Sequence, residues 1–512
     1  MSSIAVKDAG EIKANNRKME TYKSHINIVW FKRDLRLQDN EAIFNAVHSK
    51  TPTLLLYVFE NLLQNDGHYS DRHWDFIKQS ISDINQQLSL LNTKILSVSG
   101  EVISIINSIQ EIYKIDTVFS HQETGIKITY ERDKSFKRFC KNNLIHWKEN
   151  INNGIFRGLE NRKNWVKLWE DYMNSKQFLF EASSQNFLSL ESIQFLENSF
   201  ETVSLETIPN NVFQKGGTTM ANKYLESFFN NRYQDYNRNI SKPLLARKSC
   251  SRLSPYIAWG NLSSRQVLQK AANFRLVSTN KKQIDSFVSR LTWQAHFIQK
   301  FEMEEIMEFE SVNKGFHTLK KKINYSYIQA WQTGQTGFPI IDACMRCLNQ
   351  TGYLNFRMRA LVVSFFTHNL WQPWQEATQH LSKMFLDFEP GIHFPQLQMQ
   401  AGETGINMLR IYNPLKNSLE HDPNGEFIKK WVPELQNLPI PFVHNPSKMT
   451  FLDQKFNNFD LGTDYPKPIV NIERTRKHAS DFLWNMKKNP LVKEENNRIL
   501  KLHTMADVGD ND

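Results

Sequence analysis

Apolar residues in the first third of the chain form short runs separated by polar segments. Runs of this length are typical of buried β-strands, and they lie at 26–31, 53–59, 94–98 and 117–120. Between them, apolar residues recur at helical spacing over 77–91 and again over 102–109. Alternating strands and helices predict a doubly wound parallel sheet, which binds ligands beyond the carboxyl ends of its strands.

The pattern becomes helical at about residue 216. Apolar side chains from Met220 to Phe229 share one helix face, and residues 359–374 are apolar nearly all round until Pro373. Residues 151–215 mix polar pieces with short helical patterns. We therefore predict a tail at 1–25, an α/β domain at 26–150, a connection at 151–215, an all-α domain at 216–485 and a second tail at 486–512.

The stretch FLDFEPGIHFPQ, residues 385–396, contains two carboxylates, two prolines, a glycine and a histidine. Proline and glycine at this density interrupt helices and favour an irregular backbone. We predict a loop that presents His393. A lone histidine is more often a satisfied structural residue, so this pattern by itself leaves the role of His393 open.

Composition narrows the class of protein. Of the 512 residues 40% are hydrophobic, and no apolar run reaches the length of a membrane span. The four cysteines are scattered and the N-terminus resembles neither a signal peptide nor a transit peptide, so we expect a cytoplasmic protein. The net charge of +10 favours polyanions such as nucleic acid.

Cys344 and Cys347 form a C-x-x-C pair in an apolar helical pattern. An iron–sulfur cluster needs four thiolates, and the other two cysteines lie far away in the sequence. Small buried cysteines explain the pair better. No zinc-binding spacing is present, and we predict no metal site.

Four motifs show a resemblance to a known family. They are VWFKRDLRLQDN (29–40), SRLSPYIAWGNLSSRQ (251–266), the segment 330–366 and LRIYNPLKNSLEHDPNGEFIKKWVPEL (409–435). In this order they resemble the DNA photolyase/cryptochrome superfamily over roughly 26–480, as a divergent bacterial-type photolyase-like member. The resemblance implies an α/β antenna domain and an all-α domain that binds FAD in a U-shape.

The resemblance also implies an FAD site. Ser251, Leu253 and Ser254 match the turn that meets the pyrophosphate, although a serine before Pro255 is by itself more often an ordinary N-cap. Matching positions around the cofactor are Tyr236, Phe287, Gln294, Arg359, Asp387 and Glu389. Arg359 and Asp387 match an ion pair beside the flavin, and a structural role for that pair is equally open. His393 matches the residue that faces flavin N5, where a histidine can donate or withhold a proton; an alignment slip of two residues would put Gly391 there.

The resemblance further implies a pocket for a flipped-out pyrimidine photoproduct in DNA. The family's Glu, two Trp, Asn, Arg and Met match Arg290, Trp293, Met399, Phe356, Arg357 and Ala360, so two of the six are kept. The replacement of the acid by Arg290 reverses a charge. An arginine there can still donate hydrogen bonds to carbonyl oxygens or contact a phosphate.

The family's usual relay of three tryptophans from the flavin to the surface is also altered. Trp374 matches the middle member, whereas Leu397 and Lys321 stand at the other two positions. Trp371, Trp331 and Tyr353 offer an alternative route, although aromatic residues in a helical bundle are usually core. The resemblance also implies a second, antenna chromophore near 32–37. It does not identify whether that chromophore is a folate or a deazaflavin.

From these features we predict an FAD-dependent, blue-light-driven DNA photolyase that repairs UV-induced pyrimidine photoproducts by electron transfer from reduced flavin. Trp293, Arg290, His393 and Trp374 would take part in the chemistry. Damaged DNA would be the partner, held by Arg290, Trp293, Phe356, Arg357 and Met399, with no membrane contact and a monomeric protein. A cryptochrome-type blue-light receptor is the alternative, because the pocket and the relay are altered. A nucleic-acid-binding flavoprotein without photochemistry is a third, weaker interpretation.

Overall fold

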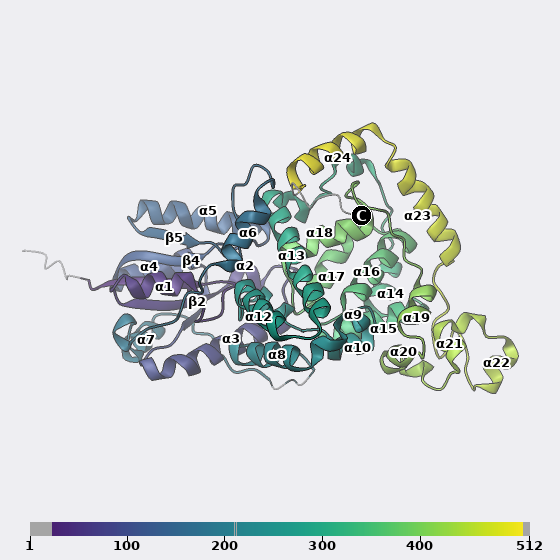
Figure 1. Cartoon of the computed structure of the whole chain (residues 1–512), viewed down its shortest axis with the longest axis horizontal. Helices are drawn as coiled ribbons and strands as arrows, with labels where there is room; N and C mark the ends of the chain where they lie inside the picture. The colour runs from purple at the N-terminus through teal and green to yellow at the C-terminus, as the bar shows by residue number, and fades with distance from the viewer. Residues whose placement is uncertain (1–22, 209, 211, 505–512) are drawn as a thin grey trace, which may run out of the picture.

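A computed structural model describes residues 23–504 except 209 and 211. The predicted tail at 1–25 therefore lies almost entirely outside the described residues. The chain forms an α/β domain and a larger helical domain that lie side by side, shown in purple to blue at the left and teal to yellow at the right of Figure 1. This arrangement confirms the predicted fold class. None of the described helices is both long and apolar enough to cross a membrane.

The first domain is built on a five-stranded parallel sheet with strand order β3-β2-β1-β4-β5. The strands are β1 (His25–Phe31), β2 (Thr53–Glu60), β3 (Leu96–Gly100), β4 (Lys114–His121) and β5 (His146–Asn150). The helices that connect and cover them are α1 (Glu41–His48), α2 (Asn61–Gln64), α3 (Asp71–Leu88), α4 (Val102–Ile112) and α5 (Lys127–Asn142). The strand order reverses between β1 and β4, which is where this fold opens a crevice at the carboxyl ends.

The predicted apolar runs became β1 to β4, whereas β5 was missed. The sequence of β5, HWKEN, alternates exposed and half-buried residues until Asn150. It pairs on one side only, with β4, so its solvent-facing residues carry no apolar run. A sequence pattern tuned to buried strands could not detect it.

Residues 151–215 contain α6 (Trp165–Asn174) and α7 (Leu190–Glu197) and pack closely against the sheet domain. The backbone N–H of Val203 donates to Ser97 O, and Phe187 forms a bridge with Thr53. Trp165 and Trp169 are buried against helix α13 of the other domain, in a cluster with Ala295 and Ile298. This connection thus contacts both domains.

The second domain is all-α. Its first half comprises α8 (Thr218–Asn230), α9 (Tyr236–Asn239), α10 (Pro243–Ser249), α11 (Ser254–Ala258), α12 (Ser264–Val277), α13 (Lys281–Met303), α14 (Tyr325–Thr333) and α15 (Pro339–Thr351). The second half comprises α16 (Phe356–Ser364), α17 (Gln375–Met384), α18 (Pro390–Ala401), α19 (Pro414–His421), α20 (Glu426–Trp431), α21 (Ile440–His444), α22 (Phe451–Phe456), α23 (Ile472–Met486) and α24 (Pro490–His503). Helix α16 continues into a π-turn over Phe365–Asn369 and is buried on nearly every side, as its apolar sequence predicts.

Two sequence predictions are wrong. Residues 390–396 are the start of helix α18 and not a loop, because Pro390 occupies its first position, where no backbone N–H is needed. Pro395 lies inside this helix, where it cannot donate the backbone hydrogen bond to the carbonyl oxygen of Gly391. The predicted tail at 486–512 contains α24, whose Val492 and Ile499 are fully buried; only 505–512 lie outside the described residues.

Candidate functional site

The turn before α11 brings together the residues predicted to meet a pyrophosphate. Ser254 is the first residue of α11, Leu253 is buried, and the Ser251 hydroxyl lies 3.5 Å from the Leu253 backbone nitrogen. Arg252 between them has a left-handed backbone with φ of 61°. That conformation is uncommon for a residue other than glycine and is concentrated at functional sites.

Arg232 and Arg252 flank this turn, and neither forms an ion pair with a carboxylate among the residues that the structure describes. Arg232 donates to the carbonyl oxygens of Ser251 (3.1 Å) and Cys250, and Arg252 donates to the Gln214 side chain at 2.7 Å. The Nε of Arg252 is buried with no hydrogen-bond partner among the described residues. Burial lowers the pKa of both guanidinium groups. Such an excess of buried positive charge fits the two phosphates of FAD.

Aromatic side chains form a wall beside the turn. Tyr236, at the start of α9, packs edge-on against Phe228 and Phe287, with ring centroids 5.9 and 6.0 Å apart. Phe287 lies on α13, and the half-buried Gln294 lies two turns further along the same helix. The structure thus brings the predicted residues from α9, α11 and α13 to one region.

Arg359 and Asp387 form the predicted ion pair. Nη2 of Arg359, on α16, is 2.8 and 3.0 Å from the two carboxylate oxygens of Asp387, and its Nε donates to Leu354 O at 2.9 Å. The Asp387 side chain is 6% exposed, whereas that of Arg359 is 30% exposed. Arg359 therefore reaches an open side of the site while it neutralises a buried carboxylate.

Glu389 points away from this pair, into the interface between the domains. Its carboxylate lies 3.4 Å from Nη1 of Arg33, which also donates to Phe388 O at 3.0 Å. The guanidinium of Arg33 stacks on the Trp259 ring at 4.4 Å. Burial raises the pKa of Glu389 to about 7, and the long contact with Arg33 offsets only part of that effect. The structure does not place Glu389 with Asp387, and its predicted contact with FAD stays a prediction.

His393 lies in the first turn of α18, between Phe388 and Phe394. Its Nε2 is 3.1 Å from the carbonyl oxygen of Thr378. A carbonyl oxygen only accepts, so Nε2 carries the proton. Burial lowers the pKa of His393 to about 3, with a smaller contribution from His68. The imidazole is therefore neutral at physiological pH, and its Nδ1 is an acceptor.

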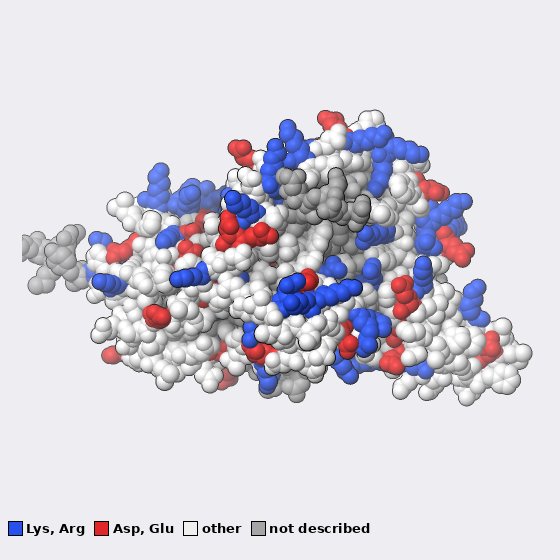
Figure 2. All heavy atoms as spheres, viewed as in Figure 1, with Lys and Arg blue, Asp and Glu red and all other residues white. Residues whose placement is uncertain are grey.

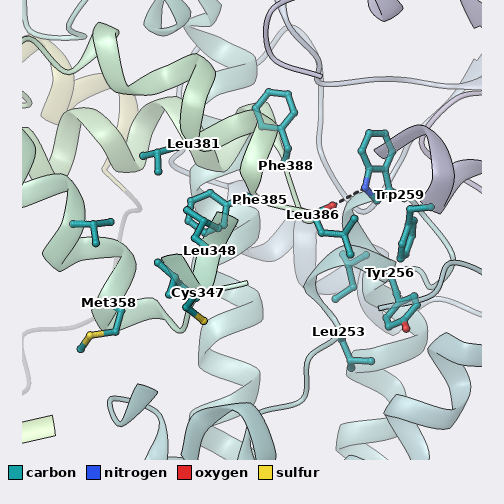
Figure 3. Close-up of a cluster of buried hydrophobic side chains, with 14 of the residues drawn as sticks. Leu253, Tyr256, Trp259, Cys347, Leu348, Met358, Leu381, Phe385, Leu386 and Phe388 are labelled. Atoms are coloured by element: carbon teal, nitrogen blue, oxygen red, sulfur yellow. Dashed lines mark hydrogen bonds between the residues drawn. The ribbon is translucent and has the colours of Figure 1, made fainter. Parts of the chain in front are cut away.

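A core cluster ties the two halves of the site together. The indole N–H of Trp259 donates to Leu386 O at 2.9 Å, and this contact links the chain after α11 to the chain before Asp387 (Figure 3). Figure 3 also shows Cys347 among the side chains of this cluster. Cys344 and Cys347 are both buried, and no group of His, Cys, Asp or Glu in the described chain is arranged to hold a metal ion.

Four of the residues predicted to meet a DNA lesion form a rim at the surface, namely Arg290 and Trp293 on α13 and Phe356 and Arg357 at the start of α16. The Arg290 guanidinium lies 5.6 Å from the ring of Phe356, which is 43% exposed, and Trp293 is 48% exposed on the same helix as Arg290. Arg357 donates to the Tyr412 hydroxyl at 3.0 Å. Met399 is half-buried on α18 and Ala360 is buried on α16. The rim therefore offers two exposed aromatic faces and two cations.

A basic groove continues from Arg357. It has a volume of about 510 Å³ and is lined by Arg410, Tyr412, Lys416 and Arg476. A neighbouring hollow of about 430 Å³ shares Arg476 and extends to Lys477 and Trp484 on α23. Figure 2 shows Lys and Arg side chains gathered over α23 and α24 at the upper right. Arg410, Tyr412 and Lys416 stand in the motif LRIYNPLK, which was recognised without assigning them a role.

The crevice at the carboxyl ends of the strands is filled by charged side chains. Arg132 on α5 contacts Glu60, Glu123 and Asp133 at 2.5, 2.6 and 2.9 Å. The space that remains between Arg33, Glu123 and Glu389 measures about 40 Å³, which holds about three water molecules. The predicted folate or deazaflavin near this crevice stays a prediction.

Sequence profiles of one family match both domains. A profile described as DNA photolyase matches residues 27–156, and one described as the FAD binding domain of DNA photolyase matches residues 287–485. The second domain is therefore an FAD-binding domain, and the arginine-lined turn and the wall of Tyr236 and Phe287 fit that cofactor.

Relatives cover nearly the whole chain. A deoxyribodipyrimidine photo-lyase of Buchnera aphidicola is 28% identical over 480 residues, 88% of this chain and 95% of its own. A cryptochrome DASH of Synechocystis is 24% identical over 88% of this chain and 96% of its own. The crystal structure of a Synechocystis cryptochrome superposes with a TM-score of 0.81 at 23% identity, covering 90% of this chain and 99% of that one, which shows the same fold. The chain belongs to the DNA photolyase/cryptochrome superfamily.

Proposed function

We propose that the protein is a DNA photolyase that uses FAD and blue light to split pyrimidine photoproducts. The observation that carries the proposal is the rim of exposed aromatic rings and arginines that opens into a basic groove. Bound FAD in its reduced state supplies the electron that light transfers to the damaged base. Relatives named as photolyases support the reaction class.

The rim residues have the chemistry that a flipped-out base requires. Trp293 and Phe356 offer stacking surfaces that replace base stacking in the duplex. Arg357 is oriented by the Tyr412 hydroxyl, and Arg290 is held over Phe356. Both can donate to pyrimidine carbonyl oxygens or to phosphate. Arg410, Lys416 and Arg476 then hold the DNA backbone along the groove.

His393 contributes a hydrogen-bond acceptor to the flavin side of the site. Since its only ring proton is given to Thr378 O, the nitrogen left for a cofactor is Nδ1. If bound FAD presents N5 to His393, this atom would accept a hydrogen bond and would favour a protonated N5. An asparagine at this position, in contrast, would carry both a donor and an acceptor.

We expect His393→Asn to change the absorption spectrum of the FAD that accumulates under blue light, because an amide can donate to N5 where Nδ1 cannot. The measurement is anaerobic illumination of purified protein with an external reductant, followed by visible spectroscopy. His380→Asn is the matched control, since His380 in α17 is another half-buried histidine whose pKa burial lowers, to about 4. Identical spectra for the wild type and His393→Asn would show that His393 does not face N5.

The repair reaction is tested with chemically reduced protein and short DNA carrying a defined cyclobutane or (6-4) lesion. Illumination with blue light is expected to remove one of the two lesions, as followed by chromatography. Arg290→Ala is expected to slow repair by about tenfold or more, the effect of one charge-assisted hydrogen bond. Arg275→Ala, which removes an exposed arginine on α12, should leave repair unchanged. Absence of light-dependent repair of both lesions in FAD-loaded protein would refute the proposal.

A cryptochrome-type photoreceptor is the second candidate. It is favoured by the altered pocket, in which Arg290 and Phe356 stand at the family's Glu and Asn positions, and by the relatives named as cryptochromes. The same assay separates the two functions. Protein that holds FAD and responds to light, yet repairs neither lesion, would be a receptor.

A further inference from the structure

A chain of hydrogen bonds leads from the buried indole of Trp374 to a carboxylate. Trp374 has no exposed surface, and its Nε1–H donates to Ser311 Oγ at 3.1 Å. The Ser311 hydroxyl in turn donates to Glu403 Oε2 at 2.7 Å. Both distances lie within the range in which protons are transferred between side chains. The indole proton therefore has one relay atom between it and an anionic acceptor.

Lys321 is the last member of this chain of hydrogen bonds. Its ammonium lies 3.1 Å from Glu403 Oε1 and 3.3 Å from Thr367 O, with its side chain 1% exposed. The same ammonium lies 4.8 Å from the centre of the Trp371 ring. Lys321 thus pairs with the Glu403 side chain and also places a positive charge over the Trp371 ring.

Three separate segments of the polypeptide hold this chain of hydrogen bonds rigidly. Gln398 on α18 accepts from the Val312 backbone N–H at 2.8 Å and donates to Met307 O and Glu310 O, which holds the turn carrying Ser311. Glu403 follows Gly402, which ends α18 with φ of 76°. Trp374 stands directly before α17. The bonds are therefore built into the packing of α18 and α17 and do not depend on a mobile side chain.

We propose that Glu403, acting through Ser311, accepts the indole proton when Trp374 is oxidised. Bound FAD, when oxidised and excited by light, would supply the oxidant that removes one electron from Trp374. The resulting indole radical cation is a strong acid, so its Nε1 proton moves to Ser311 Oγ as the Ser311 hydroxyl proton moves to Glu403. Trp374 becomes a neutral radical, FAD has gained one electron, and Glu403 has become a carboxylic acid. The positive charge has moved from the indole to the pair of Glu403 and Lys321, so return of the electron to Trp374 also requires return of the proton.

Lys321 favours Trp374 over Trp371 as the residue that carries the radical. A positive charge over the face of the Trp371 ring opposes removal of an electron from that ring. A relay that ended at a surface tryptophan would release its proton to water. In this protein Lys321 stands at the surface position of the relay. The proton acceptor Glu403 is buried, with its side chain 7% exposed. Glu403 is thus a proton acceptor for Trp374, and Ser311 and Lys321 are its positioning residues.

The test is transient absorption of the full chain loaded with oxidised FAD after a blue flash. Protonated and neutral tryptophan radicals have different visible spectra, so the protonation state is read directly. We expect a neutral radical in the wild type, whose formation is slower in D₂O than in H₂O. In Glu403→Gln we expect a radical that stays protonated and recombines with FAD about tenfold faster or more. Ser311→Ala should give the same result as Glu403→Gln.

Trp374→Phe and Trp371→Phe identify the radical. The signal should vanish in Trp374→Phe and persist unchanged in Trp371→Phe. A protonated or absent radical in the wild type overturns the proposal without any variant, as does a neutral radical in correctly folded Glu403→Gln or Ser311→Ala. The inference rests on the proposed light chemistry and not on repair. Repair by chemically reduced protein does not need Trp374. A failure of the repair assay therefore leaves the radical measurement valid, and a failure of the radical measurement leaves the repair assay valid.

Discussion

Replacing Arg359 with methionine is expected to yield a protein that no longer retains FAD. The change leaves the carboxylate of Asp387, 6% exposed, without its guanidinium, and an unpaired buried charge costs about 3–5 kcal/mol. No other cation pairs with Asp387 within the part of the chain that the structure describes. The free energy of unfolding should fall by about that amount, and bound FAD per protein, measured by absorbance after gel filtration, should fall by at least about tenfold.

The control is Arg275→Met, which removes an arginine from an exposed ion pair with Asp285 in the same domain. Exposed pairs contribute little, so FAD content should equal that of the wild type. Arg359→Lys retains the charge but loses the donation from Nε to Leu354 O, so its FAD content should fall between those of the other two variants. Full retention of FAD by Arg359→Met would exclude a role for this pair at the cofactor.

Arg132→Met is expected to destabilise the sheet domain by about 3–5 kcal/mol. Arg132 is in contact with three carboxylates, Glu60, Glu123 and Asp133, whose side chains are 3%, 4% and 7% exposed. Without the guanidinium these groups repel one another in a crevice that also contains Glu389. Urea unfolding followed by circular dichroism should show the loss, as an earlier transition or an additional one.

Arg138→Met provides the matched comparison for Arg132. Arg138 lies on the same helix, α5, but is exposed and donates to the hydroxyl of Ser135. Its loss should change stability very little. Equal effects of the two substitutions would mean that the charged crevice does not hold the domain together.

Local patterns predicted much of this protein because they depend on near neighbours in the chain. The apolar runs of β1 to β4 and the all-round apolar α16 are each readable in isolation. The pair of Arg359 and Asp387 was found through motif matching, although the residues lie 28 positions apart. The edge strand β5 and the start of α18 were missed because one lacks an apolar run and the other begins with a proline that helices accept only at the first turn.

The sequence by itself determined the two-domain fold class and the family, and it singled out the turn of Ser251, Leu253 and Ser254 before α11. Only the tertiary structure decided that Glu389 contacts Arg33 instead of Asp387, and that α24 packs where a tail was expected. It also decided that Trp374 and Glu403 share Ser311, which is 63 positions from one and 92 from the other. The physical reason is that periodicity and turn chemistry act over a few residues, whereas burial, ion pairing and hydrogen-bond chains depend on which distant segments are packed together.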